Sequence, residues 1–163
     1  MLQHMASRYP ETGTITKVGE IMTERLETIN FLNTAQEAAL KMADKNVSSL
    51  AVIDDDGKAA GIVTERDLVR RVCTKNTHSS MITIQNIISV PVKTVSPDTA
   101  IDEAADIMVR NKLRHLIVAD ENNAPIGIVS ATDIVGFIRE NNVAKTQVSK
   151  EILEALEREG RYY

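Results

Sequence analysis

Residues 61–69 read GIVTERDLV, and residues 127–135 read GIVSATDIV, 66 positions further along the chain. The tripeptide EAA at residues 37–39 returns at the same offset. When residues 20–72 are laid on residues 86–138 without a gap, 14 of the 53 positions are identical. Identities that cluster at one fixed offset indicate a duplicated structural unit. We therefore expect two copies of one fold that pack as a pseudo-twofold pair, so that a cleft between them occurs twice.

The length of the chain limits what each copy can do alone. The chain has 163 residues, of which 43% are hydrophobic and 26% are charged, a composition typical of soluble globular proteins. A unit of about 55 residues buries too little surface for a stable core of its own, so we expect the copies to share one. We divide the chain into an N-terminal extension (1–17), a first repeat (18–72), a connecting loop (73–85), a second repeat (86–140) and a C-terminal amphipathic helix (141–163).

Each repeat is expected to run strand, helix, strand, strand, helix. In the first repeat the hydrophobic pattern places these elements at residues 28–29, 34–45, 49–53 and 60–63, with the last helix starting near residue 64. In the second repeat they fall at residues 93–95, 100–111, 115–119 and 126–129, followed by a final helix. An Asp-Gly pair between two apolar runs, at residues 56–57, is a strong hairpin signal. The expected fold class is α/β (α+β), with the two repeats packed sheet to sheet.

The C-terminal tail carries an apolar stripe that needs a partner. From Gln147 to Arg158, the apolar residues Ile152, Leu153 and Leu156 fall on one side of a helix. The sequence leaves two positions open for this helix: packing on its own chain, or packing on a second copy in a homodimer.

Composition disfavours several classes of function. No apolar run is long enough to cross a bilayer, and the N-terminus has no signal-peptide pattern, which indicates a cytoplasmic protein with no membrane contact. A net charge of −4 argues against nucleic-acid binding. The single cysteine, Cys73, and three histidines predict neither a disulfide nor a metal site, and no third residue is placed to orient His78 toward Cys73. We therefore expect no catalytic residue, no metal and no enzyme activity.

Two short motifs could carry ligand chemistry. Thr64 and Asp67, and likewise Ser130 and Asp133, stand where a strand ends and a helix begins. A hydroxyl residue three positions before an acid forms a capping box, which closes a helix start without any ligand. A carboxylate beside free helix-start amides can also accept both hydroxyls of a ribose. The two interpretations are compatible, and the residues alone leave both open.

The whole arrangement resembles a known family. Two glycine-initiated motifs, each preceded by an EAA helix and a strand ending in Asp, together with the opening VGEIMT sequence, are similar to the tandem cystathionine β-synthase (CBS) domain pair, or Bateman module. The resemblance covers about residues 18–139. It implies that Thr64 and Asp67 bind the ribose of an adenosine-containing ligand in one cleft, and that Ser130 and Asp133 do so in the other.

The resemblance also implies which residues meet phosphate. The central strand of the second repeat opens with Arg114 and His115, where the first repeat has two serines, so the two clefts are not equivalent. Arg66 stands at a position that contacts phosphate in similar proteins. The alternatives are a solvated side chain for Arg66 and a half-buried strand residue, or a proton switch, for His115. The candidate phosphate-binding residues are Arg66, Arg114, His115 and Thr132.

The adenine base is expected in a slot with aliphatic walls, because the chain has no Trp and only five other aromatic residues. By position in the family, two groups line the slots: Met22 and Thr23 with Ile62, and Ile88 and Ser89 with Ile128. Backbone groups near Thr28 and Thr94 would form hydrogen bonds with the edge of the adenine base. Plain core packing is the alternative for the aliphatic residues.

Together these expectations describe a regulatory module. The expected ligand is an adenine nucleotide, AMP, ADP or ATP, which binds between the repeats as a regulatory ligand. The family implies a homodimer. Because only short flanks remain outside residues 18–139, the signal is expected to pass to a separate, regulated partner protein. S-adenosylmethionine or another adenosine without phosphate is the alternative ligand. A purely structural pairing module and, more remotely, a nucleotide hydrolase are the alternative functions.

Overall fold

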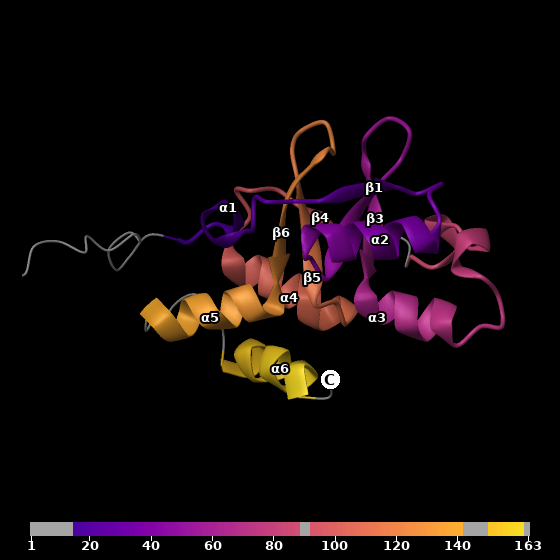
Figure 1. The fold of residues 1–163 in the computed structure, drawn as a ribbon. Helices are drawn as coiled ribbons and strands as arrows, with labels where there is room; N and C mark the ends of the chain where they lie inside the picture. The colour runs from indigo at the N-terminus through magenta and orange to yellow at the C-terminus, as the bar shows by residue number, and fades with distance from the viewer. Residues whose placement is uncertain (1–14, 89–91, 142–149, 162–163) are drawn as a thin grey trace, which may run out of the picture.

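The computed structural model describes residues 15–88, 92–141 and 150–161, and in them it has two three-stranded sheets, one from each repeat (Figure 1). The first sheet contains β1 (Thr28–Asn30), β2 (Ser49–Ile53) and β3 (Ala59–Thr64), and the second contains β4 (Thr94–Val95), β5 (His115–Ala119) and β6 (Pro125–Ser130). In both sheets the middle strand pairs parallel with the first strand and antiparallel with the third. The predicted fold class and strand order are confirmed.

One helix connects the parallel strands of each repeat, and another follows the hairpin. The connecting helices are α2 (Ala35–Lys45) and α4 (Ile101–Asn111). After the hairpins come α3 (Glu65–Leu68), which continues as a π-helix, η1 (Val69–Cys73), and α5 (Ala131–Asn141). The other elements are α1 (Val18–Ile21), the 3₁₀ helices η2 (Ser79–Met81) and η3 (Ile84–Asn86), and α6 (Lys150–Arg161). The sequence pattern predicted the helices after both hairpins but not the π-helix.

The turns of the two repeats have the same backbone conformation even where their residues differ. The residue after each connecting helix has a positive φ, 52° at Asn46 and 53° at Lys112, which are 66 positions apart. The hairpin turns behave in the same way, with φ of 77° at Gly57 and 61° at Asn123. A left-handed backbone is uncommon for a residue with a side chain, and strict sequence identity is not needed to form it. The backbone is therefore duplicated more closely than the sequence.

The segments that lead into the two sheets are exchanged between the repeats. Val18 in α1 is fully buried in the core of the second repeat, and its amide donates to the carbonyl of Thr99 at 2.8 Å. At the equivalent position, Ile84 in η3 is fully buried in the core of the first repeat, and its amide donates to the carbonyl of Asn33 at 2.8 Å. The segment expected to be a connecting loop thus contributes to a core. Each repeat therefore has its own core, which is completed by the segment that precedes the other repeat. The expectation of one shared core is wrong, because the exchanged segments supply the additional buried surface that each small repeat needs.

The two sheets also pack directly on each other. Ala51, Ala59 and Ile117, from β2, β3 and β5, form a buried cluster between them. The amide of Ala59 donates to the carbonyl of Asn123 at 2.9 Å, which joins the two hairpins near their tips. Figure 1 shows the two hairpin loops side by side at the top of the molecule. This is the predicted sheet-to-sheet arrangement.

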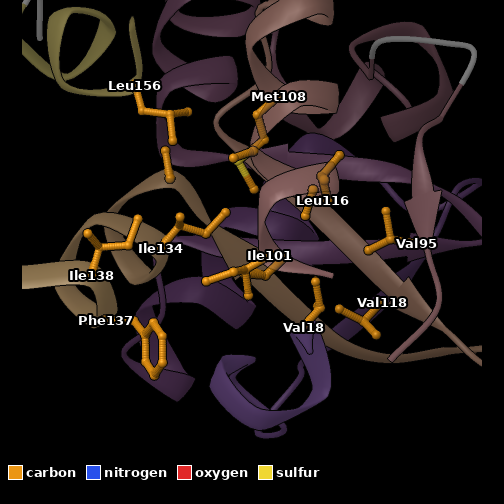
Figure 2. Close-up of a cluster of buried hydrophobic side chains, with 14 residues drawn as sticks. Val18, Val95, Ile101, Met108, Leu116, Val118, Ile134, Phe137, Ile138 and Leu156 are labelled. Carbon is orange, nitrogen blue, oxygen red and sulfur yellow. The ribbon is translucent and has the colours of Figure 1, made fainter. Parts of the chain in front are cut away.

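The C-terminal helix α6 packs on its own chain. It lies against α4 and α5 (Figure 1), and Leu156 is buried in the core of the second repeat beside Met108 and Ile134 (Figure 2). An ion pair of 2.7 Å between Arg139 and Glu157 connects α5 to α6. Of the two positions that the sequence left open, the structure has the first. The expected start of this helix at Gln147 lies outside the described residues.

Two glycines allow the exchanged segments to approach the sheets closely. A Cβ built on Gly127 would lie 2.6 Å from Sδ of Met22 and 3.2 Å from the carbonyl oxygen of Thr23. At the equivalent position, a Cβ on Gly61 would lie 3.1 Å from Cδ1 of Ile88. The first contact involves backbone, which cannot move aside as a flexible side chain can.

We predict that Gly127→Ala lowers the free energy of unfolding by about 1–3 kcal/mol, the usual cost of overpacking. The matched control is Gly136→Ala in α5, where an added Cβ meets nothing within 4 Å. That change should raise stability by about 0.5–1 kcal/mol, because glycine weakens a helix. Urea unfolding of both variants measures the difference, and equal responses would show that Met22 and Thr23 do not press on position 127.

Candidate functional site

Both Thr/Ser-x-x-Asp motifs form capping boxes. The amide of Thr64 donates to Oδ2 of Asp67 at 2.9 Å, and the amide of Asp67 donates to Oγ1 of Thr64 at 3.2 Å. In the second repeat the amide of Ser130 donates to Oδ2 of Asp133 at 2.7 Å, and the amide of Asp133 donates back to the serine hydroxyl at 3.1 Å. The capping interpretation of these motifs is therefore correct. All four side chains remain half-exposed, so the boxes do not exclude a ligand.

A cleft between the repeats contains the first of these boxes. A pocket of about 230 Å³ is lined by Ile62, Thr64, Asp67, Val92, Lys93, Leu113, Arg114 and His115. A neighbouring pocket of about 330 Å³ is lined by Ser48, Ser49, Thr64, Glu65, Arg66, Lys112, Arg114 and His115. The two pockets share Thr64, Arg114 and His115, and we call them together the first cleft. Three candidate phosphate-binding residues, Arg66, Arg114 and His115, thus lie with the candidate ribose-binding pair Thr64 and Asp67.

The hairpins explain why these residues meet. In β5 and β6, His115 stands opposite Ser130, and the amide of Ala131 at the start of α5 donates to the carbonyl of Arg114 at 2.9 Å. The first repeat has the same register, with Ser49 opposite Thr64. The start of each middle strand therefore lies beside the capping box of its own repeat. Because the sheets face each other, Arg114 and His115 also face the box of the first repeat.

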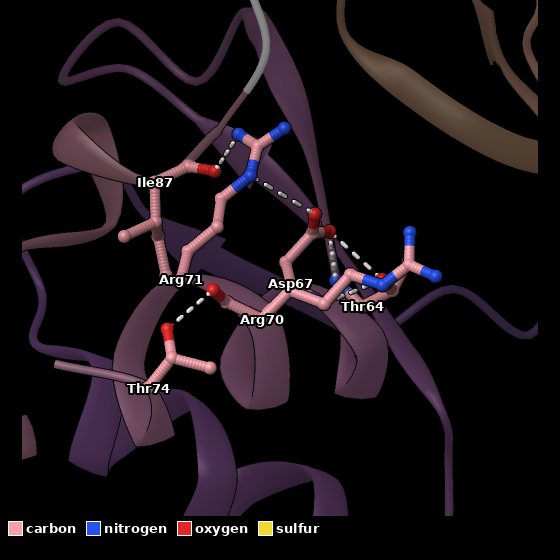
Figure 3. Close-up of polar contacts among 6 residues, drawn as sticks. All are labelled: Thr64, Asp67, Arg70, Arg71, Thr74 and Ile87. Atoms are coloured by element: carbon pink, nitrogen blue, oxygen red, sulfur yellow. Dashed lines mark hydrogen bonds and ion pairs between the residues drawn. The ribbon is translucent and has the colours of Figure 1, made fainter.

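Asp67 is held from two sides (Figure 3). Its Oδ2 accepts from the amide and, at 2.8 Å, from the hydroxyl of Thr64, while its Oδ1 lies 3.7 Å from Nε of Arg71. Nη1 of Arg71 donates to the carbonyl of Ile87, in the segment exchanged from the other repeat. Arg71 was missed by the sequence analysis, although its place four residues after Asp67 on a helix was a usable signal. Its counterpart in the second repeat is Phe137, so only the first box has this support.

His115 lies among charges of both signs. Its burial is the main cause that holds its pKa below the usual 6.5, and the positive charge of Arg114 lowers that pKa further. The carboxylate of Asp133 acts in the opposite direction, and the smaller contributions of Arg66 and Asp67 oppose each other. His115 is therefore neutral in the folded protein at neutral pH.

This shift predicts a pH dependence of stability. The unfolded chain binds a proton at His115 near pH 6.5 and the folded chain only at lower pH, so the unfolded state binds more protons between the two pKa values. The free energy of unfolding should therefore rise with pH across that window below 6.5 and level off above it. His115→Gln should flatten this slope in urea unfolding between pH 5 and 7, values chosen around the usual histidine pKa of about 6.5. An unchanged slope would contradict the assignment to His115.

The second box lies where β6 ends and α5 begins, and the segment that packs on β6 contains Met22 and Thr23. Thr23 and Ile128 pair through their backbones, with N···O distances of 2.9 and 3.1 Å. The expected grouping of Met22 and Thr23 with Ile62, and of Ile88 with Ile128, is therefore wrong. The lead-in segments cross to the other repeat, so Met22 and Thr23 lie on β6 and Ile88 lies on β3.

The remaining candidate residues are spread more widely. Thr132 is exposed and lines a third pocket, of about 240 Å³, together with Arg114 and the α6 residues Leu156 and Glu157. Thr28 and Thr94 are the half-buried first residues of β1 and β4. Ser89 lies outside the described residues. Val92 and Lys93 line the first cleft but were not among the predicted site residues.

Within the described ranges, no helix is long and apolar enough to cross a bilayer. The same part of the chain has no group of three or more His, Cys, Asp or Glu side chains that could hold a metal ion.

Comparison with known proteins gives a consistent result. A family model for the CBS domain matches residues 18–73 and 84–140. The chain is 36% identical over 119 residues to an uncharacterised 17.7 kDa protein of Acidianus ambivalens, a match that covers 73% of this chain and 71% of that relative.

Solved structures agree with the family match. A conserved CBS domain protein of unknown function from Thermoplasma acidophilum has a TM-score of 0.73 at 23% identity, covering 91% of this chain and 78% of the other, which is a likeness of fold. The CBS domain pair of protein MJ0100, solved in complex with 5′-methylthioadenosine and S-adenosyl-L-methionine, has a TM-score of 0.68 at 26% identity, covering 78% of this chain and 99% of the other.

Proposed function

The chain belongs to the CBS domain family, and on that premise we propose that it is a regulatory sensor that binds AMP, ADP or ATP in the first cleft. Occupancy of the cleft changes the contact of this chain with a separate partner protein, and the chain itself catalyses no reaction. The homodimer and the cytoplasmic location expected from the sequence belong to the same proposal.

The charge of the first cleft is the observation that carries this proposal. Lys93, Arg114, Arg66 and Lys112 all line it, against two carboxylates, Asp67 and Glu65. Arg and Lys side chains are the groups that bind phosphate oxygens most strongly in proteins. A cleft with this excess of positive charge, in a chain whose net charge is −4, favours an anionic ligand.

The ribose and base have candidate partners in the same cleft. Asp67 uses Oδ2 for the capping box, which leaves Oδ1 to accept from ribose hydroxyls while Arg71 holds the carboxylate in place. Ile62, Val92 and Leu113 give the pocket aliphatic walls for a flat base. That the related MJ0100 domain pair binds two adenosine compounds supports an adenosine ligand for this chain.

Arg114 offers a route from the ligand to the surface of the protein. It lines the first cleft and also the pocket that Leu156 and Glu157 of α6 help to form. A ligand shifts an equilibrium only when it binds two arrangements differently. A phosphate that draws Arg114 into the first cleft changes the surroundings of α6, so we propose α6 as the element that reports occupancy to the partner.

Calorimetric titration of the ligand-stripped protein with AMP, ADP, ATP and adenosine tests the proposal. We expect saturable binding of the phosphorylated ligands, weaker binding of adenosine, and a melting temperature that rises with ligand concentration by mass action. If none of these ligands gives heat or a melting shift, the chain is a structural pairing module.

Two further arms of this experiment distinguish a nucleotide sensor from a binder of S-adenosylmethionine and from a hydrolase. S-adenosylmethionine that binds more tightly than every phosphorylated ligand would replace the nucleotide as the regulatory ligand. Product formed from ATP with or without magnesium would make the protein a hydrolase.

A further inference from the structure

We propose that the first repeat binds an acidic amphipathic helix of a separate protein on the outer face of α2, α3 and η1, in the position that α6 takes on the second repeat. We call this surface the bare face. Its apolar side chains, all exposed or partly exposed, are Ala39, Leu40, Ala43, Leu68 and Val69. The inference goes beyond the proposed nucleotide site, because it assigns the surface on which a partner docks and requires no ligand.

The duplication shows how the equivalent surface of the second repeat is covered. There α4 packs on α5, and α6 lies against both (Figure 1). Ala105 of α4 and Ile134 of α5 are fully buried in the core that also contains Leu156 of α6. The chain therefore demonstrates that one amphipathic helix fits across this pair of helices.

The bare face presents the same kind of surface without a cover. In the described ranges α2 packs on α3 as α4 packs on α5, but no α-helix takes the position of α6 (Figure 1). Ala39, the counterpart of Ala105, is exposed. Val69 is 58% exposed and Leu40 is 63% exposed. Apolar side chains that gather on a surface mark an interaction site.

The charge of the bare face favours an acidic occupant. Residues 65–75 contain four basic and two acidic side chains, whereas residues 131–141 contain one basic and two acidic side chains. Residues 150–161, which form α6, contain four acidic and three basic side chains, and Glu157 pairs with Arg139 of α5 at 2.7 Å. A helix with the charge of α6 is thus better matched to the first repeat than to the second.

Two observations favour a separate protein over a second copy of this chain. The apolar stripe of α6 is already used on its own repeat, since Leu156 is 2% exposed. A second copy that presented its own bare face would bring the basic residues of both 65–75 segments together. Like charges brought face to face oppose association.

A helix in this position would lie beside the first cleft. In the second repeat Glu157 of α6 lines a pocket together with Thr132 of α5. The counterpart of Thr132 is Arg66, which lines the first cleft. An acidic side chain at the place of Glu157 would therefore meet Arg66, so that a docked helix and an anionic ligand use the same cation. This gives the cleft a direct effect on the partner, in addition to the one through α6.

The probe for the test is a synthetic peptide with the sequence of residues 150–161. A covalent link between its positions 154 and 158, which lie opposite Leu156 on a helix, keeps the short peptide helical. The peptide is titrated by calorimetry into the full chain. We expect saturable binding of one peptide per chain, and no binding would overturn the proposal.

Two exposed apolar positions give matched variants. Val69→Asp should lower the affinity for the peptide about tenfold or more, because it places a charge in the centre of the bare face. Leu32→Asp, at a 50% exposed leucine in the turn after β1, should change the affinity less than about twofold. A circular dichroism melt confirms that each variant folds. Equal affinity of Val69→Asp and the unmodified chain would place the peptide elsewhere and overturn the proposal.

A charge cycle tests the position of the docked helix. The peptide with Glu157→Gln should bind the unmodified chain about two- to fivefold more weakly, and this difference should vanish in Arg66→Thr. A difference that persists in Arg66→Thr would contradict the equivalence with α6. Self-association that is lost in Val69→Asp, measured by sedimentation velocity, would assign the bare face to a second copy. Peptide binding without any AMP binding would refute the proposed function and leave the docking surface standing.

Discussion

Arg114→Ser is expected to lower the affinity for AMP by about 10- to 100-fold, because a hydrogen bond to a charged group contributes about 1.5–3 kcal/mol. Serine is the residue at the equivalent position of the first repeat, Ser48, so the backbone accommodates it. The affinity for adenosine, which has no phosphate, should change less than about twofold if Arg114 acts only on phosphate. Calorimetric titration of both ligands gives the two numbers.

The matched control is Arg110→Ser on α4. Arg110 is an exposed arginine that pairs with Asp106 at 2.7 Å and lines neither of the pockets of the first cleft. Its replacement should leave AMP binding unchanged. Equal losses of AMP and adenosine binding in Arg114→Ser would mean that the residue supports the fold of the cleft and not the phosphate.

Leu156→Ala should lower the free energy of unfolding by about 2–5 kcal/mol, the usual range for removing a buried leucine. Leu156 is 2% exposed and belongs to the buried core of the second repeat. For a chain of this size each kcal/mol shifts the melting temperature by about 2–4 °C, so we expect a fall of about 4 °C or more. Thermal and urea unfolding followed by circular dichroism measure it.

Glu154→Ala on the same helix provides the comparison. Glu154 is exposed and has a 3.8 Å ion pair with Lys150, so its removal should cost about 0.5 kcal/mol or less. If Leu156→Ala and Glu154→Ala had the same melting temperature, α6 would not be docked on α4 and α5 in solution. Arg114 would then have no helix through which to report the ligand.

The duplicated pattern made most of the fold predictable. Short apolar runs bounded by turn residues located the strands, and the offset of 66 related each assignment in one repeat to its counterpart in the other. The π-helix at Val69–Cys73 and the burial of Ile84 were not predicted, because both depend on contacts with distant parts of the chain. No local pattern records such contacts.

The site was predictable only in part for the same reason. The motif residues Thr64 and Asp67 were identified by their spacing, and Arg114 by its difference from its counterpart. The exchange of the lead-in segments had no local signal, so Met22 was grouped with the wrong sheet. Lys93 was missed although the same offset relates it to Glu27, a reversal of charge that was visible in the sequence.

The crystal structure of the protein with AMP tests the central claim most directly. We predict the ribose hydroxyls within hydrogen-bond distance of Oδ1 of Asp67 and the phosphate in contact with Arg114. A nucleotide bound at Ser130 and Asp133 with the first cleft empty, or a phosphate directed away from Arg114, would contradict the account.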